Sequence, residues 1–423
     1  MSALDGAIFD IRLSEVAGSP PIKVMIGCTL GSGSQGVVRE LTVIDGRLEP
    51  TGLKHFVLKS VVRGKLKMPL LFDEIAAHAA ISHMFGHEEC NPFVMCMTGI
   101  LITNNAPLKA KLTRYIDENV GVNINAPIKN LASMLYVTDT DIGSEPHIIY
   151  EKLDGAPLNQ LINAERGRVR QYREISHSLL NGLAALHSKN VVHRDIKPEN
   201  IMIKDGQAQY FDLGLACVFH EDGSFKCDPA GGTPQYMAPE IFNGSPYFVP
   251  DRPVPPVAAA AAAAEEEAPP PPEPITAAQL AAHTRERFTS YMQADVFAMG
   301  ATLYALLFRR PIHEKTTRSK WGGPPPEILR WAVPKHDDDD DDDESRPPPP
   351  PTELSLRFDD DETQPFHDII RRMLRYNRHE RPTAAEALAA WTAAMAARGG
   401  GSKRHKTKKQ GRKRRQTNRR LSR

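Results

Sequence analysis

The stretch VHRDIKPEN, at Val192–Asn200, says more than any other about what this chain of 423 residues encodes. Three functional groups stand in it at short fixed spacings: Asp195, Lys197 and Asn200. A carboxylate can accept the proton of a hydroxyl group, an ammonium group can neutralise negative charge, and an amide oxygen can bind Mg²⁺. This combination suits the transfer of a phosphoryl group to a hydroxyl. A short motif can occur by chance, so the interpretation depends on companion motifs.

A glycine-rich segment, LGSGSQGVV, precedes it at Leu30–Val38. A glycine backbone can approach phosphate oxygens that a Cβ atom would obstruct. A dinucleotide-binding fold would place a helix directly after the third glycine. Here Val37–Val38 and Leu41–Ile44 read as strand, with a hairpin turn at Asp45–Gly46. The pattern therefore predicts a strand–loop–strand flap over phosphates. Its glycines are Gly31, Gly33 and Gly36.

Six further motifs lie along the chain, two of them before Val192–Asn200 and four after it. The two earlier motifs are a strand ending in lysine at Phe56–Lys59 and a segment of helical period at Pro69–His83, which contains Glu74. The four later motifs are the triplet Asp212–Gly214, the run GTPQYMAPE at Gly232–Glu240, the run ADVFAMG at Ala294–Gly300 and the run HERPT at His379–Thr383.

In this order and at these spacings, the motifs resemble those of eukaryotic-type serine/threonine protein kinases over roughly residues 24–395. The resemblance implies an α+β, two-lobed kinase fold with ATP in the cleft between the lobes. We expect a small lobe at about 20–152, with a five-stranded antiparallel sheet and one main helix. A mainly helical large lobe at about 153–397 would follow. Residues 1–19 would be an N-terminal extension and residues 398–423 a basic disordered tail.

The resemblance also implies roles for the residues of the catalytic loop. Asp195 would orient the acceptor hydroxyl, and Lys197 would offset charge on the moving phosphoryl group. Thr233 would hydrogen-bond to both of these residues, and Asn200 and Asp212 would bind Mg²⁺. Because Lys197 and Thr233 follow the serine/threonine pattern, we expect specificity for serine and threonine.

Other residues would hold the machinery together. Lys59 would contact the α- and β-phosphates of ATP and pair with Glu74, although the neighbouring Asp73 is an alternative partner. Asp295 would steady the catalytic loop. Glu240 would pair with Arg381.

The adenine site can be sketched in the same way. Tyr150 takes the gatekeeper position, and backbone groups of Glu151 and Leu153 would face the adenine edge. Two positions depart from the family pattern: Val57 replaces an alanine, which tightens the roof of the pocket, and Leu213 replaces a phenylalanine but stays apolar. The predicted ATP-binding residues are Leu30, Gly31, Gly33, Gly36, Val38, Val57, Lys59, Glu151, Leu153 and Met202.

The composition fits a soluble intracellular enzyme, since 41% of the residues are hydrophobic and no run reaches 18 apolar residues. The N-terminal residues 1–20 lack the apolar core of a signal peptide. Five cysteines at scattered spacings argue against a disulfide framework and for a reducing compartment. Cys217 and Cys227 are expected to be ordinary thiols, with a redox switch as the alternative. Ser224 is a candidate phosphorylation site whose phosphate would pair with Arg194, a contact that Glu221 or Asp222 would otherwise make.

The charge is strongly segregated. Residues 402–423 contain twelve Lys or Arg and no acidic residue, so the rest of the chain carries −11 (+1 minus 12). This tail predicts nuclear import, contact with nucleic acid or docking on an acidic partner. We expect no membrane partner, and a monomer that acts on protein substrates in the cytoplasm, the nucleus or both.

Three insertions interrupt the kinase pattern, at about 103–145, 243–282 and 335–361. The second contains Ala258–Ala264 and Pro269–Pro272, and the third contains Asp337–Asp343 and Pro347–Pro351. Both are of low complexity and are expected to be disordered surface loops. Such homopolymeric insertions suggest an unusual source genome, such as that of a large DNA virus or a protist.

Two other functions remain open. A pseudokinase scaffold is disfavoured because Lys59, Asp195, Asn200 and Asp212 are all present. A nucleic-acid-associated or virion-associated protein would act mainly through the basic tail, and salt-dependent DNA retention before and after deletion of residues 402–423 would test it.

Overall fold

The computed structural model describes residues 4–14, 19–32, 36–48, 55–61, 68–81, 91–119, 135–143, 145–163, 169–220, 222–225, 227, 231–241, 275–308 and 364–397. The basic tail, the acidic run Asp337–Asp343 and the predicted ATP-binding residue Gly33 lie outside these residues. The expectations for them stay predictions, as do the import, nucleic-acid and monomer expectations.

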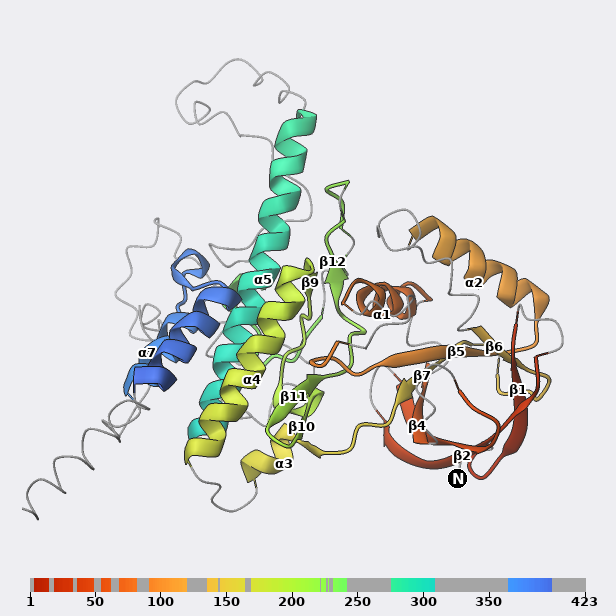
Figure 1. The fold of residues 1–423 in the computed structure, drawn as a ribbon. Helices are drawn as coiled ribbons and strands as arrows, with labels where there is room; N and C mark the ends of the chain where they lie inside the picture. The colour runs from red at the N-terminus through yellow and green to blue at the C-terminus, as the bar shows by residue number, and fades with distance from the viewer. Residues whose placement is uncertain are drawn as a thin grey trace, which may run out of the picture.

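The chain forms a β-barrel and then a mainly helical part. In space, the helix α1 (Met68–Ile81) lies between the barrel and the helices of the second part (Figure 1). The first part contains β1 (Ile8–Leu13), β2 (Ile22–Ser32), β3 (Gly36–Asp45), β4 (His55–Val61), α1 (Met68–Ile81), β5 (Met97–Thr103), α2 (Ala106–Asn119), β6 (Leu135–Thr138) and β7 (His147–Glu151). The second part contains β8 (Ala156–Pro157), α3 (Leu158–Asn163), α4 (Val169–Ser188), β9 (Val191–Val192), η3 (Pro198–Asn200), β10 (Ile201–Lys204), β11 (Gln207–Tyr210), β12 (Cys217–Val218), η4 (Pro239–Ile241), α5 (Ala277–Phe308), α7 (Gln364–Met373), η6 (Arg378–Glu380) and a helix over residues 384–397.

The alternation of side chains along β4 places the strand lysine. Phe56 and Leu58 belong to the buried cluster inside the barrel, whereas Val57 belongs to the cluster on the opposite face, beneath α1. Successive side chains of a strand point to opposite faces. Lys59 therefore shares the face of Val57, which is the face that α1 covers.

The sheet is larger than expected. The seven strands close into a barrel in the order β1-β2-β3-β4-β7-β5-β6, instead of forming a five-stranded antiparallel sheet. β6 follows the helix α2 within the first predicted insertion and pairs parallel with β5, as a helical crossover permits. β1 lies within residues 1–19 and pairs with β2 and β6, which closes the barrel.

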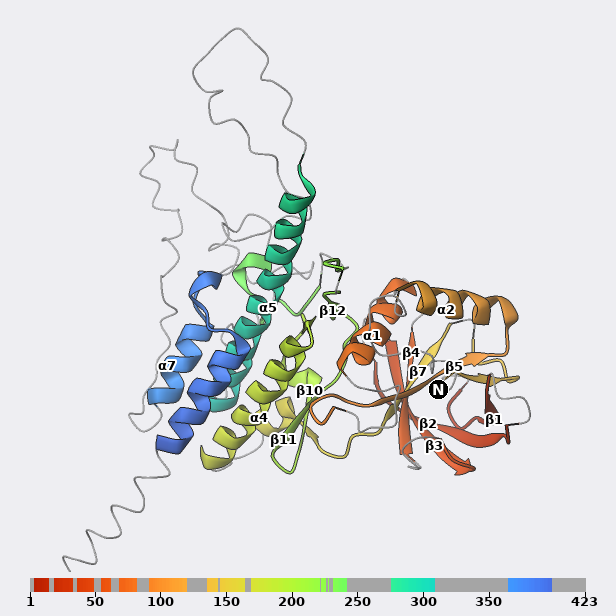
Figure 2. The same cartoon turned by 45° about the horizontal axis from the view of Figure 1, so that its top comes forward.

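The helical part has its own core. α4, α5, α7 and the helix over residues 384–397 bury one large apolar cluster, which includes Leu183, Phe366 and Trp391. Figure 2 shows α4, α5 and α7 side by side, with α1 between them and the barrel. The catalytic-loop residues, Asp212 and Thr233 lie in the loops and short elements between α4 and α5.

Helix α5 begins earlier than the sequence predicted. The second insertion was expected to extend to about residue 282, but the helix starts at Ala277. Thr276 and Gln279 form a capping box: Gln279 N donates to Thr276 Oγ1 at 3.2 Å, and Thr276 N donates to Gln279 Oε1 at 2.8 Å. The alanine-rich first turns have high helix propensity. These local signals outweigh the low-complexity appearance of the segment.

The cysteine prediction is wrong for three of the five residues. Cys217 and Cys227 form a disulfide with a Cα–Cα distance of 5.6 Å, and Cys96 is also disulfide-bonded. Phe219 and Phe225 pair as an isolated antiparallel bridge, which folds the chain back and brings Cys227 to Cys217. Cys28 is free and exposed. Within the described residues, no helix is both long and apolar enough to cross a membrane.

Candidate active site

Lys59 joins the two parts of the molecule. Its Nζ atom donates to both carboxylate oxygens of Glu74 on α1, at 2.8 and 2.9 Å. The same atom donates to Asp212 Oδ1 at 2.7 Å. Lys59 and Glu74 are buried. The structure thus selects Glu74 as the partner of Lys59, whereas the side chain of Asp73 lies outside the described part.

Lys59 and Asp212 each stabilise the charged form of the other. Burial opposes the ammonium form of Lys59, but the carboxylates of Glu74 and Asp212 raise its pKa above the ordinary value. Burial also opposes ionisation of Asp212, and the Lys59 ammonium outweighs it and lowers the pKa of that carboxyl. Leu213 is fully buried in the same apolar cluster as Ala77 and Ile81 of α1. The apolar substitution in the triplet therefore keeps its packing beneath the helix.

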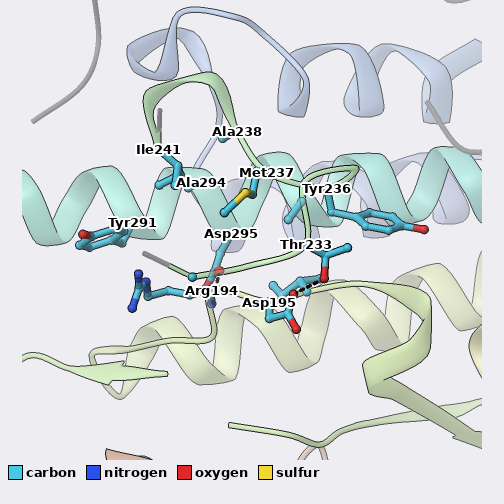
Figure 3. A pocket seen from close by; sticks show the side chains of 13 residues that line it. Arg194, Asp195, Thr233, Tyr236, Met237, Ala238, Ile241, Tyr291, Ala294 and Asp295 are labelled. Carbon is cyan, nitrogen blue, oxygen red and sulfur yellow. Dashed lines mark hydrogen bonds between the residues drawn. The ribbon is translucent and has the colours of Figure 1, made fainter. Parts of the chain in front are cut away.

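Asp195 is held by three side chains. Lys197 Nζ donates to Asp195 Oδ2 at 2.6 Å, and Asn200 Nδ2 donates to the same oxygen at 2.9 Å. Thr233 Oγ1 donates to Asp195 Oδ1 at 2.7 Å, a bond drawn in Figure 3. Lys197 also donates to Thr233 Oγ1 at 2.7 Å. The structure therefore brings together the catalytic-loop residues and Thr233 of the later segment.

Asp295 fixes the backbone before Asp195. Its two carboxylate oxygens accept hydrogen bonds from the backbone N–H groups of His193 at 2.7 Å and Arg194 at 2.8 Å. Arg194 has a φ of 66°, a left-handed conformation that is unfavourable for a side chain of this size. The two hydrogen bonds from buried Asp295 hold this conformation. Figure 3 shows Asp295 on α5 directed toward the loop of Arg194 and Asp195.

Glu240 and Arg381 form a bidentate pair with no exposed side-chain surface. The guanidinium donates to the two carboxylate oxygens at 2.5 and 2.9 Å. It also donates to three backbone carbonyl groups, and its carbon lies 4.9 Å from the ring centroid of Phe297. The pair ties the end of the segment that carries Thr233 to the C-terminal helices.

A cavity of about 940 Å³ opens between the barrel and the helical part. Of the predicted ATP-binding residues, Glu151 does not line it and Gly33 is outside the described part. The others do line it, as do Glu74, Asp195, Lys197, Asn200 and Asp212, which makes one shared site. The eight predicted residues at the cavity are Leu30, Gly31, Gly36, Val38, Val57, Lys59, Leu153 and Met202.

Comparison with known proteins gives the same family. Residues 107–251 match the family model described as a protein kinase domain. The chain is 32% identical over 146 residues to the serine/threonine-protein kinase ste20 of Aspergillus fumigatus, covering 34% of this chain and 17% of that protein. It is 30% identical over 147 residues to an SNF1-related protein kinase catalytic subunit alpha of Arabidopsis thaliana, covering 32% and 29%. Over about a third of its length, the chain is therefore similar to eukaryotic-type protein kinases.

The similarity is confined to a part of each relative. The chain spans less than a third of the length of these two proteins. A third relative, the phosphorylase b kinase gamma catalytic chain of the liver/testis isoform from Mus musculus, is 43% identical over 77 residues, which are 18% of each chain. The family thus rests on the central motifs.

A protein kinase domain implies ATP as substrate and Mg²⁺ as the usual cofactor, and this chain has suitable groups for both. Its cavity is within the range of volumes of small-molecule sites. Asp212 and Asn200, which line this cavity, supply the hard oxygen atoms that Mg²⁺ prefers. Lys59 is a cationic group that lines the same cavity.

Several residues at the candidate site were not predicted from the sequence. Ser32 and Glu199 line the cavity from within recognised motifs, so their position was an available signal. Met95 and Asn159 line it without any local pattern that indicates it. The hydroxyl group of Tyr150 was also overlooked, although it donates to Glu74 Oε1 at 2.5 Å.

Proposed function

We propose that this chain is an ATP-dependent protein kinase that transfers the γ-phosphoryl group of ATP to serine or threonine hydroxyl groups of protein substrates. The observation that carries the proposal is the arrangement of Asp195. Both of its oxygens are fixed by hydrogen bonds from Lys197, Asn200 and Thr233, at the edge of a cavity that also contains Lys59 and Asp212.

Asp195 would act on the acceptor hydroxyl. Its carboxylate would accept the hydroxyl hydrogen and direct the oxygen toward the γ-phosphorus. It would receive the proton as the new oxygen–phosphorus bond forms and the bond from the γ-phosphorus to the bridging oxygen breaks, which releases ADP. Lys197 and Thr233 hold the carboxylate in one orientation, so little rearrangement is needed when the substrate arrives. The rate enhancement comes from positioning and electrostatic stabilisation, without a phosphorylated enzyme intermediate.

Two cations of the chain face the charge of the transferring group. The ammonium of Lys59 would bind phosphate oxygens of ATP, while Glu74 keeps this lysine in place. The ammonium of Lys197 would offset charge near the acceptor oxygen. Asn200, through Oδ1, and Asp212 would hold Mg²⁺, which supplies further neutralisation of the phosphate charge.

Specificity for serine and threonine is supported by the lysine two positions after Asp195 and by its contact with Thr233. The names of the three relatives reported above include a serine/threonine-protein kinase.

Transfer of label from ATP tests this proposal. Purified protein is incubated with γ-labelled ATP, Mg²⁺ and a generic basic protein substrate, and the labelled residues are identified after acid hydrolysis. We expect labelled phosphoserine and phosphothreonine from the wild type and none above background from the Asp195→Ala variant. Equal labelling by the two proteins would contradict the proposal. ATP binding without any transfer would favour the pseudokinase alternative, and labelled phosphotyrosine alone would overturn the specificity.

A further inference from the structure

The hydroxyl group of Tyr150 takes part in the Lys59–Glu74 pair. Tyr150 stands on β7 and donates to Glu74 Oε1 at 2.5 Å. Tyr150 has no exposed surface and Glu74 is 2% exposed. The contact therefore ties the helix α1 to the sheet at the residue that positions Lys59.

Glu74 needs this donor because its carboxylate is buried. A buried carboxylate without hydrogen-bonding partners is costly, on the order of several kcal/mol. The hydrogen bonds seen within the described residues come from two side chains, Lys59 and Tyr150. Lys59 shares its ammonium with Asp212. Of these two donors, Lys59 divides its hydrogen bonds between two carboxylates, whereas the Tyr150 hydroxyl donates to Glu74.

This difference matters when ATP binds. The phosphate groups would compete for the Lys59 ammonium, and the bonds from Lys59 to Glu74 would weaken as new bonds to phosphate form. The Tyr150 hydroxyl would remain on Glu74 Oε1 and limit the rotation of the carboxylate. Glu74 would then still offer an oriented acceptor that keeps Lys59 at the cavity wall.

The surroundings of Tyr150 favour the neutral hydroxyl form. Burial raises the pKa of Tyr150 well above its ordinary value, and the negative charge of Glu74 raises it further. The ring packs in the apolar cluster that includes Ile75 and Met97, and its centroid lies 5.2 Å from that of His78 on α1. These contacts fix the ring, so the position of the hydroxyl is set independently of Glu74.

We propose that Tyr150 is a positioning residue for phosphoryl transfer: its hydroxyl group orients Glu74 and, through Glu74, sets the position of Lys59. This inference rests on the proposed kinase function. It assigns to the tyrosine hydroxyl a role in nucleotide binding that the packing of the ring does not provide.

The test removes the hydroxyl and leaves the ring. Tyr150→Phe is compared with Tyr136→Phe, which removes a hydroxyl from a tyrosine that is 1% exposed in the separate cluster inside the barrel. The readouts are the dissociation constant of Mg·ATP by calorimetry and kcat/KM for transfer. Loss of a hydrogen bond to a charged group corresponds to about a tenfold weakening for Tyr150→Phe. Tyr136→Phe should change both readouts less than about twofold.

A double-mutant cycle separates positioning from packing. Glu74→Met removes the acceptor, so Tyr150→Phe in that background should change Mg·ATP affinity by less than about twofold. A purely structural tyrosine would instead weaken binding by the same factor in both backgrounds. That result, or unchanged affinity in Tyr150→Phe alone, would overturn the inference.

Thermal unfolding of each variant confirms that the compared proteins are folded. The affinity readout also separates this inference from the proposed function. If the wild type binds Mg·ATP without transferring phosphate, the cycle still decides the role of Tyr150 in binding. If the wild type binds no ATP, both the proposed function and this inference are wrong.

Discussion

Lys59 and Asp212 are 153 positions apart in the sequence, yet Lys59 Nζ lies 2.7 Å from Asp212 Oδ1. Lys59 belongs to β4 of the barrel, and Asp212 belongs to the loop after β11 in the helical part. Asp212 has a φ of 62°, a left-handed conformation that aspartate tolerates better than most residues. The contact brings the cation expected to bind phosphate next to the carboxylate expected to bind metal.

Thr233 should control the orientation of Asp195. Thr233→Ala removes a donor to Asp195 and an acceptor from Lys197. We expect kcat to fall on the order of tenfold to a hundredfold, because hydrogen bonds to charged groups contribute about 1.5–3 kcal/mol. Thr233→Ser keeps the hydroxyl and should retain most of the activity. Steady-state kinetics would contradict this account if Thr233→Ser were as slow as Thr233→Ala.

The Glu240–Arg381 pair should contribute strongly to stability. Arg381→Met leaves the buried Glu240 carboxylate without its partner, and we expect a loss of about 3–5 kcal/mol of unfolding free energy. The control is Arg12→Met, which breaks a pair with Asp139 whose side chains are 44% and 64% exposed and should cost less than about 1 kcal/mol. Urea denaturation measures both. Equal losses in the two variants would show that burial does not set the strength of the Glu240–Arg381 pair.

Two buried histidines should make the stability of the folded chain sensitive to acid. Burial lowers the pKa of His78 to about 3 and that of His147 to about 4, from an ordinary value of 6.5. Below about pH 6.5 the unfolded chain therefore binds protons that the folded chain does not bind. The free energy of unfolding falls as the pH falls. Each histidine contributes a slope of about 1.4 kcal/mol per pH unit down to its folded pKa.

His78→Leu should remove one of these two contributions. Unfolding free energies measured between pH 6.5 and pH 4 would then depend less steeply on pH than those of the wild type. Within the described residues, neither ring nitrogen of His78 has a hydrogen-bonding partner, so the variant loses no such bond. An unchanged slope would mean that His78 is already protonated in the folded protein.

The disulfide between Cys217 and Cys227 closes a short loop in the segment before Thr233. Digestion without reduction should yield a peptide that links the two residues. Cys227→Ser should lower stability by about 2–3 kcal/mol under non-reducing conditions, whereas Cys28→Ser should not. Complete alkylation of Cys217 and Cys227 in unfolded, unreduced protein would show that the bridge does not form.

The sequence located the contacts that occur within ordered motifs. The Lys59–Glu74 pair, the support of the catalytic loop by Asp295 and the Glu240–Arg381 pair were each expected from the motif order, and the structure contains all three. These contacts join residue types whose chemistry is distinctive, so their spacing along the chain identifies them.

Other features depend on tertiary arrangement and have no such signal. β1 and β6 were not expected in the sheet, because short strands cannot be assigned to partners from periodicity alone. The Cys217–Cys227 bridge depends on how the chain folds back at Phe219 and Phe225, which spacing does not reveal. The bond from Tyr150 to Glu74 depends on the height of α1 above the sheet. The Thr276–Gln279 capping box was the exception, since its pattern was present in the sequence and was overlooked.

The central claim is that Lys59 and Asp212 belong to a single Mg·ATP site. Calorimetric titration of the purified chain with ATP, with and without Mg²⁺, tests it most directly. We predict binding of one ATP that strengthens with Mg²⁺ and weakens on the order of tenfold or more in both Lys59→Met and Asp212→Asn. Arg12→Met should bind as the wild type does. Absence of ATP binding by the wild type, or wild-type affinity in both site variants, would contradict the account.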